Sequence, residues 1–278
     1  MNKTPTTAHP GTFSVPRVWI GTSVLISVLV TISSLAGIFL ETTYSRETSA
    51  WALQAIAQDY ANLVVVMVLL VSTFYVTKHS IRGYLVWLGA YLYLLYAFMI
   101  YAFAIHFQFL FLVYVIILGL SFYTLAGGLM AVDPALTAQV LRGNPATKPA
   151  AALLLVIGVV FGMLWLAEIM PNLLAGTVPA GVIAVQLPVN PVHVLDLAFL
   201  LPGMIITAFL LWNDHVTGYI MAVPLLVFAA TMSLGIILIM VLSAIHGLPY
   251  ALPALVICGV IMVMSTGISF RFLQNTKP

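Results

Sequence analysis

Long apolar runs fill this chain, and short polar breaks separate them. Each run is long enough to cross about 30 Å of hydrocarbon as a helix, which rises ~1.5 Å per residue. A helix satisfies its own backbone hydrogen bonds in a bilayer, so the pattern predicts an all-α, polytopic integral membrane protein. We expect eight transmembrane helices, at Val18–Leu40, Tyr60–Thr77, Tyr84–His106, Gln108–Met130, Pro149–Met170, Pro191–Trp212, Gly218–His246 and Tyr250–Phe272. The number would change if the apolar segment Asn172–Val189 re-enters the membrane.

The few charged residues predict an orientation. They make up 6% of the chain, and with eight spans eight of the nine basic residues fall on one side, while only Arg46 lies opposite. Basic segments stay in the cytoplasm, so we expect both termini to be cytoplasmic and the protein to be a multi-pass protein of a cell membrane. The outer side then holds most of the acidic residues, namely Glu41, Glu47, Asp59, Glu168 and Asp196.

The predicted organisation has two halves. Residues 1–17 form a cytoplasmic tail, and 273–278 form another. Residues 18–132 and 149–272 each contain four helices, and 133–148 connect them, with a short surface helix expected at Pro134–Leu141.

Short sequence motifs that recur in both halves suggest that the halves are two parallel four-helix repeats, related by a twofold axis along the membrane normal. A His precedes Gly-Tyr at His79 and again at His215. The helix that follows ends in Ala-Ile-His in both cases, at His106 and His246. The alternative is that these motifs recur by chance, because they are short and the chain uses few residue types.

Candidate ligands gather on the outer side. Carboxylates and imidazoles bind divalent cations, carry protons or hold a cationic ligand. His193 lies three residues before Asp196, so both share a helix face, and Glu168 ends the preceding span at the same depth. We expect these three to form a site, joined by His246 or His106. The alternative is that they are solvated or complement helix N-termini. The full candidate set is Glu168, His193, Asp196, His246, His106, Asp59 and Glu41.

A second signal comes from tyrosines expected near the middle of the membrane. Tyr91, Tyr93 and Tyr96 each carry a hydroxyl that needs a partner, so they are candidates to line a cavity for an amphipathic ligand. The alternative is that they bond across helices. Pro202 lacks a backbone N–H and could kink its helix beneath Asp196.

Several classes of protein are excluded by what the sequence lacks. Cys258 is the only cysteine, so no internal disulfide, CxxC pair or covalent c-type haem can form. No lysine lies within a predicted span, which excludes a retinal Schiff base. Walker, Rossmann, HExxH and GxSxG motifs are absent, and topology explains the basic residues, so we expect no nucleic-acid partner.

The stretch Asn190–Pro202 resembles one in uncharacterised prokaryotic multi-span membrane proteins. This resemblance covers the second half and implies a prokaryotic cytoplasmic (inner) membrane, without implying an activity. Three histidines with carboxylates also resemble the seven-span zinc hydrolases related to ceramidases, but the HxxxH pair of those enzymes is missing.

Two classes of function follow. In the first, an outward-facing acidic and histidine site binds a cation, a proton or a small amphipathic ligand for transport or sensing. In the second, the protein is a membrane metalloenzyme or haem protein, and its ligands are His106, His193 and His246. A divalent metal is the cofactor that this donor set would suit, and the lipid bilayer and a small ligand or ion are the expected partners.

Overall fold

The computed structural model describes residues 15–248 and 250–276, and every regular element in them is helical. Eight helices of the described chain are long and apolar enough to cross a membrane, which confirms the predicted fold class. Of the predicted tails at 1–17 and 273–278, residues 1–14 and 277–278 lie outside the described residues, while helices reach into the rest, since α1 begins at Arg17 and α11 ends at Gln274. The elements are α1 (Arg17–Phe39), α2 (Ser49–Thr77), α3 (Ile81–Ala104), α4 (Phe111–Met130), α5 (Pro134–Leu141), α6 (Thr147–Ala175), α7 (Ala180–Val185), α8 (Pro191–Leu195), η1 (Asp196–Leu200), α9 (Leu201–Trp212), α10 (Val216–Ile245) and α11 (Leu252–Gln274).

One predicted helix start is wrong. The second span begins at Ser49 rather than Tyr60, because Thr48 caps it: the Thr48 hydroxyl accepts from the Trp51 backbone N–H at 3.3 Å. Asp59 therefore lies well inside α2 instead of opening the helix. The α5 helix has the predicted bounds, and Asp133 caps it by accepting from the Ala135 N–H at 2.8 Å.

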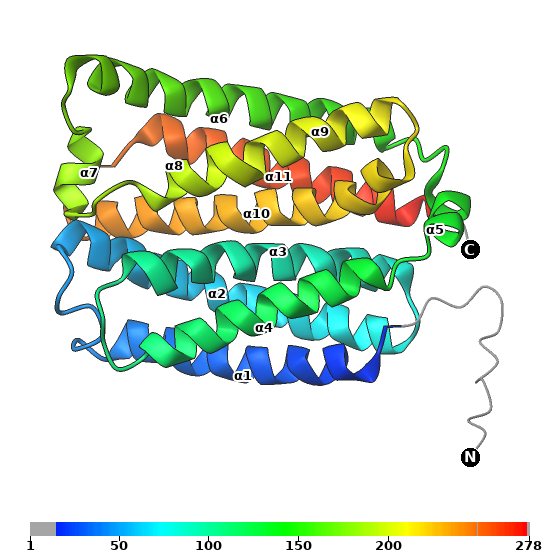
Figure 1. Ribbon diagram of the computed structural model, residues 1–278, viewed down its shortest axis with the longest axis horizontal. Coiled ribbons are helices and arrows are strands. Elements are labelled where there is room, and N and C mark those ends of the chain that lie inside the picture. Colours follow the sequence, from blue (N-terminus) through cyan, green and yellow to red (C-terminus); the bar gives the residue numbers. More distant parts are fainter. Residues whose placement is uncertain (1–14, 249, 277–278) are drawn as a thin grey trace.

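Each half of the chain packs as a ring of four helices. In the first half, α1 packs against α2, α2 against α3, α3 against α4 and α4 against α1. In the second half, α9 packs between α6 and α10, while α11 contacts both α10 and α6. The two halves meet where α10 lies against α3 and α2, with the second half above the first in Figure 1. The order of neighbours is the same in both rings, but superposition of the halves stays a prediction.

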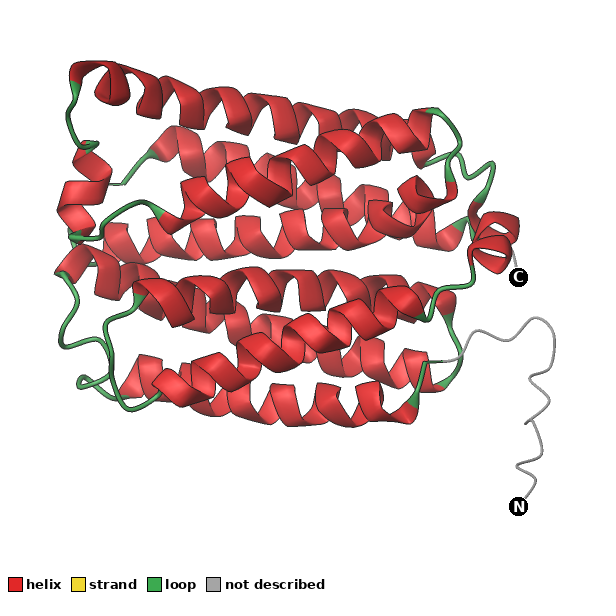
Figure 2. Ribbon diagram, viewed as in Figure 1, coloured by secondary structure: helices red, strands yellow, loops and turns green. Residues whose placement is uncertain are grey.

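The connections gather at the two ends of the bundle, as Figure 2 shows. The α1–α2 and α3–α4 connections and α7 lie at one end, on the left in Figure 1. The α2–α3 and α9–α10 connections and α5 lie at the other end. We call the first the α7 end and the second the α5 end. The α7 end carries the predicted outer loops, so an outward-facing α7 end is the orientation that the basic residues predict.

Helix α3 lies at the centre of the molecule and carries large side chains that are fully buried. Trp87 and Tyr91 both donate to the Ser23 hydroxyl of α1, at 2.9 and 2.8 Å. Tyr84 donates to the Gly128 carbonyl of α4 at 2.8 Å. Outward side chains such as Leu112 are apolar and exposed, as contact with lipid requires.

Candidate functional site

Asp196 lies at a break in the helical pattern. Asn190 caps α8 by accepting from the Val192 N–H at 2.9 Å. The helix then passes through the π-helical turn η1, which begins at Asp196. Pro202 follows it and has no N–H to continue the normal hydrogen-bond ladder, which supplies a local cause for the irregular turn. Turns of this kind are frequent at functional sites because they redirect side chains.

The Asp196 carboxylate is buried and joined to both halves of the chain. Its Oδ1 accepts from the Tyr96 hydroxyl of α3 at 2.8 Å, and its Oδ2 accepts from the Trp165 indole N–H of α6 at 2.8 Å. The residue is 7% exposed. A charge without partners is costly inside a membrane, so these two donors stabilise the carboxylate.

A buried imidazole, that of His193, lies near this carboxylate and faces an exposed one. Its imidazole is buried one turn before Asp196, and its ring centroid lies 4.6 Å from that of Trp165. Its Nε2 lies 3.7 Å from Glu168 Oε2, too far for a hydrogen bond, and has no other hydrogen-bond partner. The Glu168 side chain is 41% exposed. We name Glu168, Trp165, His193 and Asp196 the Asp196 cluster: it runs from an exposed carboxylate to a buried one.

The other predicted members lie apart from this cluster. His106 Nδ1 contacts Glu47 Oε2 at 2.9 Å, and Glu47 Oε1 accepts from the His106 backbone N–H at 2.7 Å. The exposed His246 has its Nδ1 2.8 Å from the Leu242 carbonyl of its own helix. Glu41 is exposed in the α1–α2 connection. Within residues 15–248 and 250–276, no three His, Cys, Asp or Glu side chains converge to hold a metal ion.

Asp59 lies in a separate cluster that the sequence did not predict. The Tyr44 hydroxyl donates to Asp59 Oδ2 at 2.5 Å, and the Tyr101 hydroxyl lies 2.9 Å from Oδ1. Asp59 is 1% exposed, and helix α1 passes so close that a Cβ at Gly37 would lie 1.9 Å from Oδ2. Burial raises the pKa of the Tyr44 hydroxyl well above its usual value, and the nearby negative charge of Asp59 raises it further. Tyr44 therefore stays protonated and donates. We name Asp59, Tyr44 and Tyr101 the Asp59 cluster.

A polar chain extends the Asp59 cluster along α2 and α3. The Asn62 amide donates to the Tyr101 hydroxyl at 3.4 Å, and Asn62 Oδ1 accepts from Tyr93 at 3.0 Å. Gln58 donates to the Tyr93 hydroxyl and reaches α10, where a Cβ at Gly235 would lie 2.8 Å from Gln58 Oε1. The sequence signal was present in Gln58 and Asn62, which are four residues apart on one face of α2.

The three tyrosines that we considered as cavity lining all bond across helices. Tyr91 bonds to Ser23, Tyr93 to Asn62 and Tyr96 to Asp196. These contacts correspond to the alternative interpretation, in which the hydroxyls join helices.

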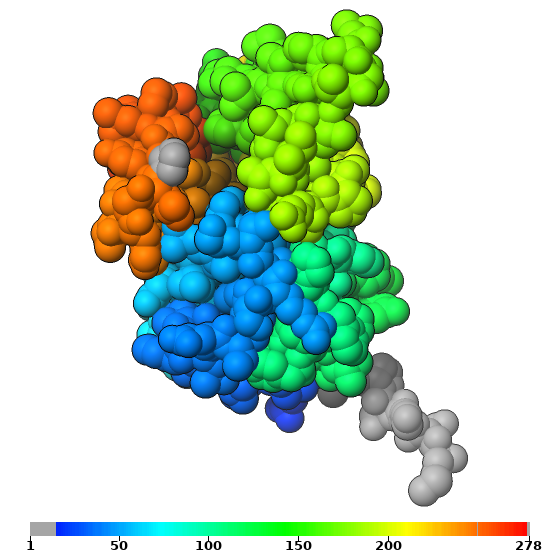
Figure 3. Space-filling view, turned by 90° about the vertical axis from the view of Figure 1, so that its left-hand side faces the viewer, coloured from blue at the N-terminus to red at the C-terminus, as the bar shows by residue number. Residues whose placement is uncertain are grey.

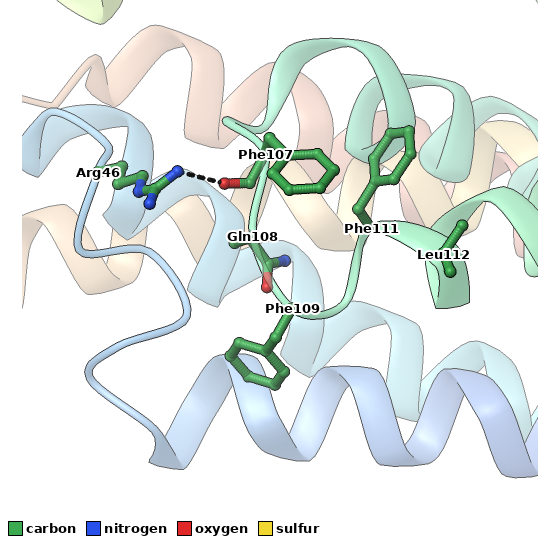
Figure 4. A pocket seen from close by; sticks show the side chains of 6 residues that line it. All are labelled: Arg46, Phe107, Gln108, Phe109, Phe111 and Leu112. Atoms are coloured by element: carbon green, nitrogen blue, oxygen red, sulfur yellow. Dashed lines mark hydrogen bonds between the residues drawn. The ribbon is translucent and has the colours of Figure 1, made fainter.

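A cavity of about 330 Å³ lies at the α7 end, between the α1–α2 and α3–α4 connections (Figure 4). Four of its lining residues are Phe107, Phe109, Phe111 and Leu112, and the charged one is Arg46. Arg46 Nη1 donates to the Phe107 carbonyl at 2.7 Å, so the guanidinium holds the two connections together. The space-filling view of this end shows residues of these connections at the surface (Figure 3).

The chain matches no protein-family model, no curated protein and no solved structure.

Proposed function

We propose that this membrane protein takes up a proton at Glu168, His193 and Asp196, for proton-coupled transport or for sensing pH. The observation that carries the proposal is the buried His193 imidazole, whose unbonded Nε2 faces the exposed Glu168 carboxylate at 3.7 Å. Imidazole changes its charge between about pH 5 and 8. A proton that reaches Glu168 can pass to Nε2 after a small movement or through one water.

The donor set favours a proton over a metal cation or a larger ligand. Both oxygens of Asp196 already accept hydrogen bonds, from Tyr96 and Trp165. A hard cation needs about six oxygen ligands, and the Asp196 cluster contains only the two carboxylates of Glu168 and Asp196. A proton needs no such set of oxygens, and a protonated His193 would be stabilised by Glu168 and Asp196.

The alternative of a metalloenzyme or haem protein needs convergence of the three outer histidines. In the structure, His106 bonds to Glu47 and His246 to the Leu242 carbonyl, while His193 faces Glu168. No contact in the described part of the chain brings these three histidines together.

Fluorescence of Trp165 tests proton uptake directly, because a charged imidazolium quenches a neighbouring indole. The chain has five tryptophans, so the Trp165 signal is the difference between the wild type and the Trp165→Phe variant. We expect this signal to fall reversibly when the pH is lowered and His193 takes up a proton. The titration should disappear in His193→Gln and persist in His246→Gln. A titration that survives His193→Gln would contradict the proposal.

Vesicles that contain a pH-sensitive dye and the purified protein separate transport from sensing. Proton entry driven by an imposed pH gradient, and lost in Asp196→Asn, would indicate transport. A His193 titration without proton entry would indicate sensing. Absence of both signals would refute the proposed function.

A further inference from the structure

A groove of about 630 Å³ opens beside the α5 end, between α2, α3 and α11. Its volume lies in the range of small-molecule sites. Its lining comes from both halves of the chain, since α2 and α3 belong to the first and Leu273 of α11 to the second. The groove is far in the sequence from the residues of the Asp196 cluster, and the inference drawn from it is independent of the proposed function.

The lining changes from apolar to polar along the groove. Met67 and Val71 of α2 and Val86 of α3 line the part toward the middle of the bundle. Tyr75 and Arg82 line the part where α2 ends and α3 begins. Met67 lies ten residues before the end of α2, so the apolar part reaches about 15 Å inward at ~1.5 Å per residue. This polarity matches one acyl chain that runs along the helices below a polar headgroup.

Arg82 is held in place at the polar mouth. Its Nε donates to the Thr276 hydroxyl at 2.6 Å, and its Nη2 lies 3.3 Å from the Thr276 carbonyl. These contacts fix the plane of the guanidinium, whose remaining N–H groups suit the oxygens of a phosphate. Lys78 lies in the same connection, but its ammonium is 5.5 Å from the centre of the Phe74 ring and neither residue lines the groove, so Arg82 is the basic residue of its lining.

We propose that this groove binds a phospholipid with an anionic headgroup, with its phosphate at Arg82 and one acyl chain along Met67 and Val71. Basic sites between membrane helices recognise anionic headgroups, and the apolar surface supplies the binding free energy of the chain. The α2–α3 connection and the C-terminal part of α11 lie at the same end of the bundle (Figure 1). The lipid would therefore join the two halves where Arg82 already bonds to Thr276.

Native mass spectrometry of the detergent-purified protein tests the headgroup. Phosphatidylglycerol and phosphatidylcholine with the same acyl chains are added in equal amounts. We expect one phosphatidylglycerol to be retained at least fivefold better, and this preference to disappear in Arg82→Gln. Arg17→Gln is the matched control, because Arg17 begins α1 at the same end without lining the groove. Equal retention of both lipids, or a preference that survives Arg82→Gln, would overturn the proposal.

A second pair of variants tests the acyl chain and does not depend on Arg82. Val71→Trp fills the groove, while Val64→Trp places the same ring on an exposed position of α2 outside it. We expect a severalfold loss of bound phosphatidylglycerol only in Val71→Trp. Glycerol phosphate, which has the headgroup chemistry without the chains, should fail to displace the lipid at equal concentration. Displacement by glycerol phosphate would reveal an anion site alone and overturn the proposal.

Discussion

Two aspartates lie inside the helical bundle, and each accepts hydrogen bonds from two aromatic side chains. Asp59 is enclosed by Tyr44 and Tyr101 and is 1% exposed. Asp196 has Tyr96 and Trp165 as donors but also lies one turn from His193, which faces the exposed Glu168. The two carboxylates therefore differ in their surroundings. Asp59 is enclosed by tyrosines, whereas Asp196 has an imidazole one turn away that faces an exposed carboxylate.

The backbone around Asp59 also differs from the backbone around Asp196. Asp59 lies in the regular helix α2, against which α1 packs closely at Gly37. Asp196 begins a π-helical turn that Pro202 follows. A regular, tightly packed helix holds its side chains in one arrangement, whereas an irregular turn has weaker backbone constraints. We therefore expect changes in the Asp59 cluster to alter stability, and changes in the Asp196 cluster to alter the response to pH.

The largest effect should come from Gly37→Ala. The new Cβ would lie 1.9 Å from Asp59 Oδ2 and 2.7 Å from the Tyr44 hydroxyl, so α1 or Asp59 must move. We expect the free energy of unfolding to fall by about 3 kcal/mol or more, at the upper end of what overpacking of a core causes. Denaturant unfolding in detergent, followed by circular dichroism, measures the change.

Gly21→Ala is the matched control on the same helix, because nothing lies within 4 Å of a Cβ at Gly21. It should raise stability by roughly 0.5–1 kcal/mol, since alanine favours a helix more than glycine does. Equal effects of Gly37→Ala and Gly21→Ala on stability would show that α1 does not pack closely against Asp59.

Removing one aromatic donor from each cluster should have a smaller and unequal effect. Tyr101→Phe leaves Asp59 with Tyr44 alone and removes a buried partner of Asn62, so it should cost about 1–3 kcal/mol. Trp165→Phe should cost about 0.5–1.5 kcal/mol, because Trp165 is partly exposed and water can replace its N–H. The same unfolding measurement gives both values. A larger loss in Trp165→Phe would reverse the proposed division between the clusters.

The sequence predicted those features that depend on local spacing. Helical periodicity predicted that His193 and Asp196 share a face. The positions of the ends of two adjacent spans predicted that Glu168 lies at the same depth. The Asp59 cluster could not be predicted in this way, because it needs Tyr44 of a connection to fold back onto α2. We also predicted that α2 begins at Tyr60, which placed Asp59 at the end of the helix instead of inside it. The link between Asp196 and Tyr96 depends on packing between the two halves, which no spacing within one half reveals.

The pH dependence of stability should reveal the sealed Tyr44 hydroxyl. The pKa of Tyr44 is raised in the folded protein, mainly by burial, so above about pH 10 the unfolded chain releases a proton that the folded protein keeps. Stability from this group is complete below about pH 10 and is lost as the pH rises, by at most ~1.4 kcal/mol per pH unit. Tyr44→Phe should make the decline above pH 10 less steep. Unfolding curves between pH 9 and 11 test this, and an unchanged slope would show that Tyr44 is accessible to solvent when folded.

The smallest effect should come from His246→Gln, which separates the Asp196 cluster from the wider histidine set that we predicted. His246 is exposed, and its imidazole Nδ1 lies 2.8 Å from the Leu242 carbonyl of its own helix. Exposed positions of this kind change stability by less than about 0.5 kcal/mol when substituted. The Trp165 titration should likewise keep its midpoint, because no contact of His246 leads to the Asp196 cluster. Parallel measurement with His193→Gln, which should abolish the titration, provides the matched comparison. A shifted midpoint in His246→Gln would show that His246 approaches the cluster in the membrane, and His246 would then belong to the outer site as predicted.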